Sequence, residues 1–160
     1  MLNRDYREIL QCLLEERVQF LLVGAYAMAA HGVPRATGDI DLWVRPNEEN
    51  AQRVFRALAR FGAPLEGTEP REFANPGLIF QIGVIPRRID ILTSIDGMCF
   101  DDAAIDHITV MIDDLEIPVL SRAALIANKR ASARPKDLLD VQILEPQART
   151  GTHVDLPPGT

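Results

Sequence analysis

The chain has 160 residues, with 17 lysines and arginines against 23 aspartates and glutamates, which gives a formal net charge of −6. This length suits one domain with one hydrophobic core, and a hydrophobic share of 47% excludes intrinsic disorder. The negative balance argues against broad, sequence-independent DNA binding, which needs many cations facing phosphates.

The first half of the chain alternates helix and strand signals. Residues 4–18 carry apolar side chains at helical spacing and predict an amphipathic helix. Residues 19–23 form a short apolar run that predicts a buried strand, stopped by Gly24. The alanine-rich residues 25–30 then favour a second helix.

A second strand and a third helix follow. Residues 39–44 are rich in strand-forming side chains, and Asn47 is a good cap for a helix reaching to about Phe61. Glycine and proline then punctuate a long loop over residues 62–77. Two further strands are predicted over residues 78–85 and 88–92.

The rest of the chain is segregated by charge. Residues 101–116 contain only acids among their charged side chains, whereas residues 121–136 contain only cations, on a helix predicted to start at a Ser121 cap. Pro135 suits the first turn of a last helix to about residue 144. We therefore expect an α/β (α+β) fold with one mixed sheet, a single domain over residues 1–145, and a flexible tail over 146–160.

The cysteines and the termini indicate a cytoplasmic protein. Cys12 and Cys99 are too few and too far apart for a disulfide framework or a CxxC metal site, so we expect two reduced, mostly buried thiols. The N-terminus lacks the apolar core of a signal peptide. The longest apolar stretch, residues 20–30, is too short to span a bilayer, so no membrane association is expected.

Three aspartates are the best candidates for chemistry. Asp39 and Asp41 are two apart on a predicted strand, so their side chains share a face while the residues between them turn to the core. Paired carboxylates repel each other unless a cation neutralises them, and they suit Mg²⁺ or Mn²⁺. Asp90 stands alone in an apolar strand, and three carboxylates converge if that strand lies beside the first. A solvent-facing pair, and an ion pair of Asp90 with Arg87 or Arg88, remain the alternatives.

The order of these motifs resembles a known superfamily. Val23-Gly24-Ala25, Asp39-Ile40-Asp41-Leu42 and Ile89-Asp90-Ile91 follow the pattern of nucleotidyltransferases of the DNA polymerase β type. The stretch over residues 23–44 is particularly similar to small AbiEii-like toxin nucleotidyltransferases, which often carry HGxxRxTxDID. Six residues match that motif here: His31, Gly32, Arg35, Thr37, Asp39 and Asp41. The resemblance implies the nucleotidyltransferase fold over about residues 15–145.

The resemblance also implies a mechanism with two divalent ions, Mg²⁺ or Mn²⁺. Asp39, Asp41 and Asp90 would bind the metal, and Asp90 would also take the proton of an acceptor hydroxyl. The nucleoside triphosphate (NTP) would be held by seven residues: Gly24, Ala25, Arg35, Thr37, Lys129, Arg130 and Lys136. The superfamily usually has glycine or serine where this chain has Ala25, which offers only its backbone N–H.

Purely structural roles remain alternatives for several of these residues. Gly24 also suits a tight turn. The cations of residues 121–136 are also typical of a solvated helix face, and Arg35 and Thr37 also suit a structural role in bracing the loop before the strand. His31 suits a structural cap, and Asp137 and Asp140 suit ion pairs with neighbouring cations.

Three functions fit these observations. The first is an active nucleotidyltransferase whose acceptor is an RNA end, a protein or a small molecule, with a toxin–antitoxin role by resemblance. The second is a catalytically weak or inactive binding module with the same fold. The third is an antitoxin-like protein or an assembly partner that works by protein contact. An antitoxin or a second copy of the chain is the expected protein partner.

Overall fold

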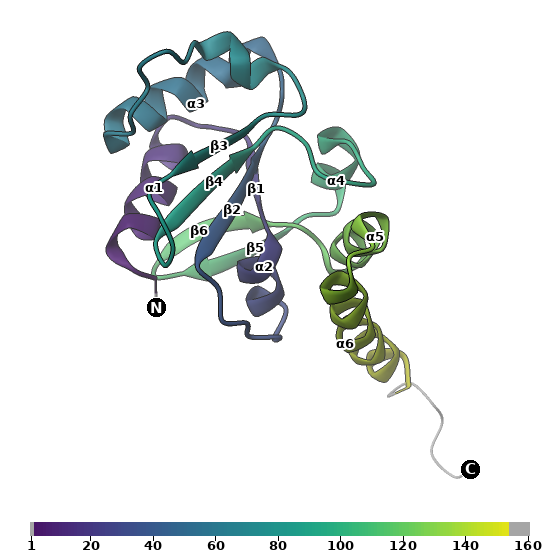
Figure 1. Cartoon of the computed structure of the whole chain (residues 1–160). Helices are drawn as coiled ribbons and strands as arrows, with labels where there is room; N and C mark the ends of the chain where they lie inside the picture. The colour runs from purple at the N-terminus through teal and green to yellow at the C-terminus, as the bar shows by residue number, and fades with distance from the viewer. Residues whose placement is uncertain (1, 154–160) are drawn as a thin grey trace, which may run out of the picture.

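The structure, a computed structural model, describes residues 2–153, and the side chains of residues 2–145 (Figure 1). Six strands form one mixed sheet in the order β3-β4-β2-β1-β6-β5. The strands are β1 (Phe20–Val23), β2 (Asp39–Val44), β3 (Ile79–Ile82), β4 (Arg88–Leu92), β5 (Ile108–Ile112) and β6 (Leu115–Val119). The helices are α1 (Arg4–Glu15), α2 (Gly24–Ala30), α3 (Glu48–Phe61), α4 (Phe100–Ile105), α5 (Arg122–Ser132) and α6 (Pro135–His153), with a 3₁₀ helix η1 (Pro70–Ala74).

The sheet mixes both strand directions around its centre. β2 runs antiparallel to β1 and parallel to β4, while β1 is parallel to β6. The β3 and β5 strands pair antiparallel with β4 and β6 and form the two edges of the sheet. The predicted α/β class with one mixed sheet flanked by helices is therefore confirmed.

Side-chain caps place the predicted helix starts. Asn47 accepts a hydrogen bond from the backbone N–H of Asn50 and begins α3, and Ser121 accepts one from Ala124 and begins α5. A capping side chain pairs one of the free N–H groups that every helix start leaves. Because the cap is local chemistry, both starts were visible in the sequence.

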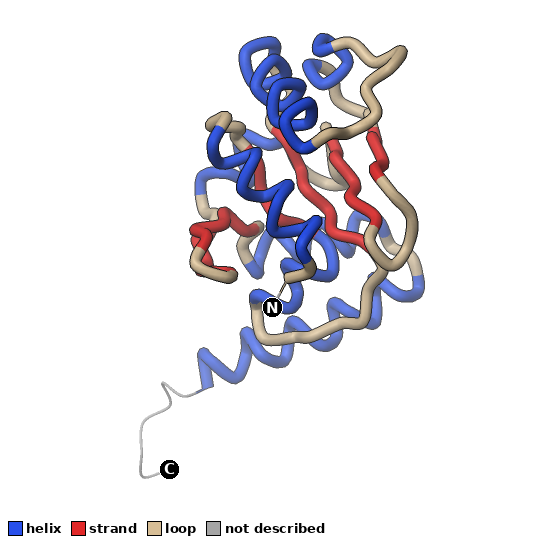
Figure 2. The backbone as a smooth tube through the Cα atoms, turned by 90° about the vertical axis from the view of Figure 1, so that its left-hand side faces the viewer, coloured by secondary structure: helices blue, strands red, loops and turns tan. Residues whose placement is uncertain are grey.

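The core lies between the sheet and the α1–α3 pair. Ile40 and Leu42 of β2 are fully buried on this side, whereas Trp43 lies on the other face of β2, 1% exposed, with an edge-to-face contact to Phe100 of α4. Figure 2 shows α1 crossing in front of the sheet, whereas Figure 1 places the α5–α6 hairpin on the other side. The side of β2 that carries Asp39 and Asp41 consequently faces the α5–α6 hairpin.

The structure differs from the sequence predictions in three places, apart from shorter bounds for α1 and β3 and the short helix η1 inside the predicted loop. The acidic residues 101–116 contain α4, β5 and the start of β6, where no strand was predicted. The last helix runs to His153 rather than to about residue 144, and residues 154–160 of the expected tail lie outside the described residues. Cys12 is buried as expected, but Cys99 is exposed because it precedes α4 at the surface.

The missed hairpin has a physical reason. Asp113 and Asp114 join β5 to β6 with φ of 47° and 63°, as a two-residue hairpin turn requires. Glycine or asparagine usually signals such a turn, and two aspartates in a run of acids indicated only a solvated surface.

No helix within the described residues combines the length and the apolar content that a membrane span requires.

Candidate functional site

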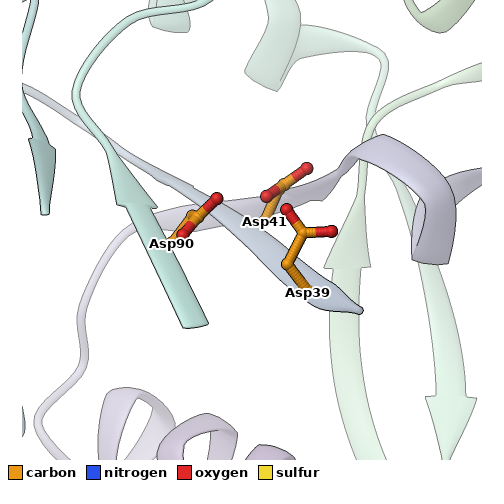
Figure 3. Close-up of side chains that lie close together, drawn as sticks. All are labelled: Asp39, Asp41 and Asp90. Carbon is orange, nitrogen blue, oxygen red and sulfur yellow. The ribbon is translucent and has the colours of Figure 1, made fainter. Parts of the chain in front are cut away.

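Two neighbouring strands bring three carboxylates together. The parallel register of β2 and β4 pairs Asp41 with Asp90 and Asp39 with Arg88. Alternate residues of a strand share a face, so the three aspartates project from one side of the sheet toward one another, as Figure 3 shows. One oxygen of each carboxylate lies within 4.8 Å of the other two. The convergence expected from the sequence is present, and we call these residues the carboxylate triad.

Gly24 makes room for one member of the triad. Val23, the last residue of β1, pairs with Asp41 across the antiparallel ladder. A Cβ atom on Gly24 would lie 2.3 Å from Oδ2 of Asp41, and the glycine has φ of +70°, which side-chain-bearing residues rarely adopt. The absence of a side chain at Gly24 therefore serves the Asp41 carboxylate directly, in addition to the turn into α2.

Arg88 contacts two members of the triad. Its Nη2 donates to Oδ2 of Asp39 at 3.1 Å, and its Nε lies 3.1 Å from Oδ1 of Asp90. Neither that Nε nor that Oδ1 makes a hydrogen bond of good geometry with any described residue, although both atoms are buried. The ion pair left open by the sequence thus exists, and it coexists with the convergence of the three acids.

The three carboxyl groups of the triad have different pKa values, because burial, mutual repulsion and hydrogen bonds act on them unequally. Burial, helped by the charges of Asp39 and Asp90, raises the pKa of Asp41 to about 7. Burial also raises the pKa of Asp90, although Arg88 opposes the change. Burial acts in the same direction on Asp39, but hydrogen bonds from Thr37 and Arg88 outweigh it and hold the pKa of Asp39 below its usual range. A further cation would therefore stabilise the ionised forms of Asp41 and Asp90.

The triad fits a divalent ion such as Mg²⁺ or Mn²⁺. Carboxylate oxygens are the hard ligands that these ions prefer. The buried Oδ1 of Asp90 lacks a hydrogen bond within the described residues, and a metal ion would compete for it with Nε of Arg88 at 3.1 Å. An ion would also offset the repulsion that raises the pKa of Asp41. The identity and number of ions remain predictions.

Two cavities meet at the triad. The larger, of about 570 Å³, lies over β3 and β4 and includes Ile79, Gln81 and Ser94 in its lining. The smaller, of about 350 Å³, includes Ala25 and Met28 of α2. Six residues line both cavities: Gly24, Asp39, Asp41, Lys129, Arg134 and Asp137. The arrangement offers two compartments that share one set of charged groups.

A second charged cluster faces the triad, with Arg35 from the loop before β2 and its other members on the α5–α6 hairpin. Lys129 Nζ lies 2.9 Å from Oδ2 of Asp140 and 3.7 Å from Oδ1 of Asp137. Arg35 contacts the other oxygen of Asp140, and Nε of Arg134 donates to Asp137 at 2.7 Å. We call these five residues the ion-pair cluster. Each of its three cations already has a carboxylate partner.

The lysine and both aspartates of the ion-pair cluster are buried, whereas Arg134 is exposed. The exposed fractions of Lys129, Asp137 and Asp140 are 8%, 2% and 1%. Burial lowers the pKa of Lys129, although Asp137 opposes the change. Such a network is stable only while its members remain paired, because a single buried charge is costly.

The structure brings most of the predicted nucleotide-binding residues to the cleft. Oγ1 of Thr37 donates to Oδ1 of Asp39 at 2.9 Å, which braces that carboxylate. Ala25 and Lys136 line the smaller cavity. Arg130 instead pairs with Glu145 at the surface and is not among the residues that line either cavity. The binding roles of these residues remain predictions.

Structural roles explain some of the residues near the site. His31 caps the end of α2, and its Nε2 lies 2.8 Å from the carbonyl oxygen of Leu120. Asp137 and Asp140 pair with cations, as the sequence allowed. The link between Arg35 and Asp140 was not foreseen, because 105 positions separate them. The i, i+3 spacing of the two aspartates on one helix was the available signal.

Comparison with protein families yields one match. The family described as "Nucleotidyl transferase AbiEii toxin, Type IV TA system" matches residues 8–154. No curated protein matches the chain in sequence.

Three solved structures share the fold. The Thermotoga maritima protein TM1012, named as a nucleotidyltransferase, has a TM-score of 0.57 at 20% identity, covering 94% of this chain and 96% of its own. The lincomycin-bound lincosamide antibiotic adenylyltransferase LnuA has a TM-score of 0.59 at 14% identity, with coverages of 91% and 97%. The antibiotic-resistance factor ANT(2'')-Ia has a TM-score of 0.56 at 15% identity, with coverages of 94% and 92%.

Proposed function

The chain belongs to the AbiEii family of nucleotidyltransferase toxins, and from that premise we propose that it transfers a nucleoside monophosphate from an NTP to a hydroxyl group. The convergence of Asp39, Asp41 and Asp90 within 4.8 Å is the observation that carries this proposal. In the transfer, the acceptor oxygen bonds to the α-phosphorus, the bond to the bridging oxygen breaks, and pyrophosphate leaves with that electron pair.

The triad would hold two divalent ions, Mg²⁺ or Mn²⁺. When bound, such ions orient the triphosphate and stabilise the charge that develops on the attacking and leaving oxygens. Thr37 and Arg88 hold the Asp39 carboxylate in place by hydrogen bonds of 2.9 and 3.1 Å. Gly24 leaves the space that the Asp41 carboxylate occupies.

Asp90 is the proposed proton acceptor. It is 6% exposed and lines the larger cavity, where an acceptor molecule would enter. Its raised pKa makes it a better base than a solvated aspartate. We propose that the proton of the acceptor hydroxyl passes to Asp90 as the new ester bond forms.

The triphosphate belongs in the smaller cavity under this proposal. Four cations line it (Arg35, Lys129, Arg134 and Lys136), together with the start of α2 at Gly24 and Ala25. Four aspartates also line it, so the cavity has no excess of positive charge before an ion arrives. Nucleotide binding should therefore depend strongly on the divalent ion.

The acceptor and the physiological role belong to the same proposal. An RNA end, a protein hydroxyl and a small molecule remain the acceptor classes, and the family supports the role of a toxin. A cytoplasmic location is part of the proposal. An antitoxin or a second copy of the chain remains the proposed partner.

The direct test measures transfer of label from each α-labelled NTP in Mg²⁺ or Mn²⁺. The acceptors are bulk RNA, the protein itself and lincomycin, the last because it occupies the similar structure of LnuA. Asp90→Asn should lower transfer by about 10³-fold, since it removes the base and a ligand. Asp102→Asn, an exposed acid outside both cavities, is the matched control. Equal transfer by wild type and Asp90→Asn would contradict the mechanism.

A nucleotide-binding module without turnover is the second candidate. Two observations favour it: Ala25 lacks the hydroxyl that a serine would supply, and the three cations of the ion-pair cluster already have carboxylate partners. Calorimetry separates the two candidates. Binding of Mn²⁺ and NTP without transfer to any acceptor supports the module, and no binding of either excludes both functions.

A further inference from the structure

The β5 strand forms an open edge of the sheet. It pairs with β6 and has no strand on its other side within the described residues. Figure 2 shows this hairpin at the left margin of the sheet, on the side away from β3. The outer N–H and C=O groups of an edge strand can pair with an added strand. The opposite edge, β3, borders the catalytic cleft, so β5 is the edge that the proposed reaction does not use.

The side chains of β5 do not protect this edge. Proteins usually blunt an exposed edge with a lysine, a proline or a bulge, and the sequence of β5 (ITVMI) contains no charge and no proline. Met111 is 61% exposed and Ile108 is 37% exposed, while Ile105, just before the strand, is 82% exposed. Ile108 and Met111 project from opposite faces of β5, so each face of this edge carries an exposed apolar side chain.

One face of β5 extends the hydrophobic core. Val110 and Ile112 pack against the core, and their partners across the ladder are Ile117 and Leu115. Thr109 and Met111 project from the opposite face. An added strand with alternating apolar residues would therefore lengthen the core row on one face and present its other residues beside Met111.

The charge around the edge is negative and only partly compensated. Within residues 101–116, Asp101 pairs with Arg45 and Asp114 pairs with Arg7. Asp102, Asp106 and Glu116 make no ion pair with any described residue. Glu116 lies on β6 directly opposite Met111, and Asp106 precedes β5. Uncompensated acids thus lie beside the open edge and at its start.

We propose that the β5 edge binds an extended, lysine- or arginine-rich segment of a partner protein by strand addition. Backbone hydrogen bonds would hold the segment, its apolar residues would extend the core row, and its cations would face Asp106 and Glu116. A second copy of this chain is a poorer occupant. It would bring the same uncompensated acids and no opposite charge to match them.

The test uses a labelled peptide of four Lys-Val repeats and measures fluorescence anisotropy with the full chain. Two further peptides define the mode of binding: four Glu-Val repeats reverse the charge, and N-methylation of alternate amides removes the hydrogen bonds of one edge. We expect a dissociation constant of about 10–100 µM for the first peptide and at least tenfold weaker binding of the other two.

Matched variants locate the site. Met111→Lys should raise the dissociation constant of the Lys-Val peptide about tenfold. Glu116→Lys, on the neighbouring strand, should raise it by a similar factor. Ile79→Lys is the control, because it adds the same charge at a residue that is 62% exposed on the other edge. Hydrogen exchange should show new protection of β5 amides when the peptide binds.

Three outcomes would overturn the proposal. The first is equal weakening by Met111→Lys and Ile79→Lys, which would indicate attraction to net charge alone. The second is protection of β3 rather than β5. The third is a dimer in sedimentation that Met111→Lys dissociates, which would make a second copy the occupant. None of these results bears on nucleotidyl transfer, which depends on the opposite part of the sheet.

Discussion

The two charged clusters that face each other across the cleft are built in opposite ways. In the carboxylate triad, three acids share one arginine, Arg88. In the ion-pair cluster, two acids hold three cations, and each cation has a partner. The formal charges are therefore −2 for the triad together with Arg88 and +1 for the ion-pair cluster. A folded chain leaves like charges together only where something else compensates them, so we propose that the triad binds a cation and that the ion-pair cluster supports the fold.

The largest expected effect is a loss of stability when the ion-pair cluster loses Asp140. Asp140→Ala leaves Lys129 and Arg35 without their shared carboxylate, and Lys129 is 8% exposed. Removing one partner of a buried ion pair costs about 3 kcal/mol, so denaturant unfolding should show a loss of that size. Asp106→Ala, at an exposed acid without an ion pair among the described residues, should change the free energy of unfolding by less than about 0.5 kcal/mol. Equal losses would mean that the ion-pair cluster does not support the fold.

A smaller effect tests the space beside Asp41. Gly24→Ala places a methyl group 2.3 Å from Oδ2 of Asp41 at a φ of +70°. Gly32→Ala has a similar φ, +88°, with no atom within 4 Å of the added Cβ. The control therefore carries the backbone strain alone, about 1 kcal/mol, and Gly24→Ala should cost about 2 kcal/mol more. Thermal unfolding measures both, and equal costs would show that the carboxylate moves aside freely.

The third prediction concerns pH. Because the pKa of Asp41 is raised to about 7 in the folded protein, its stabilising contribution is complete at low pH and is lost as the pH rises through 7. Asp41→Asn stays neutral at every pH, so in EDTA it should gain stability relative to wild type as the pH rises from 5 to 8, by about 2 kcal/mol. A stability difference that does not change with pH would place the pKa of Asp41 in its ordinary range.

The smallest effect is the competition between Arg88 and a metal ion. Arg88 occupies oxygens of Asp39 and Asp90, so Arg88→Gln should tighten Mn²⁺ binding about fivefold, equivalent to about 1 kcal/mol. Arg87→Gln, at the exposed neighbouring residue, should leave it unchanged. Calorimetry with Mn²⁺ alone measures both. Weaker binding by Arg88→Gln would mean that Arg88 orients the carboxylates for the ion.

Local chemistry explains which parts of this molecule were predictable. The bounds of β2 and the caps of α3 and α5 followed from strand-forming residues, Asn47 and Ser121. The triad followed from period-two spacing once β4 was assumed to lie beside β2, and the register confirms that neighbour. These features depend on residues close in sequence or on one assumption about pairing.

The rest depends on contacts between distant segments. Nothing near Lys129 indicated that Asp140 would also hold Arg35, which approaches from before β2. The effect of Gly24 on Asp41 requires the β1–β2 pairing, and the β5–β6 hairpin requires two aspartates at positive φ. Each of these is a tertiary or conformational fact that a linear pattern does not contain.

The contact between Gly24 and Asp41 also limits how this sequence can diverge. A side chain at position 24 and a carboxylate at position 41 compete for the same volume, so neither position can drift independently. Homologues that acquire a larger residue at 24 should be those that have first shortened or lost the acid at 41. Loss of the glycine would then mark lineages in which the chemistry has been abandoned while the fold persists.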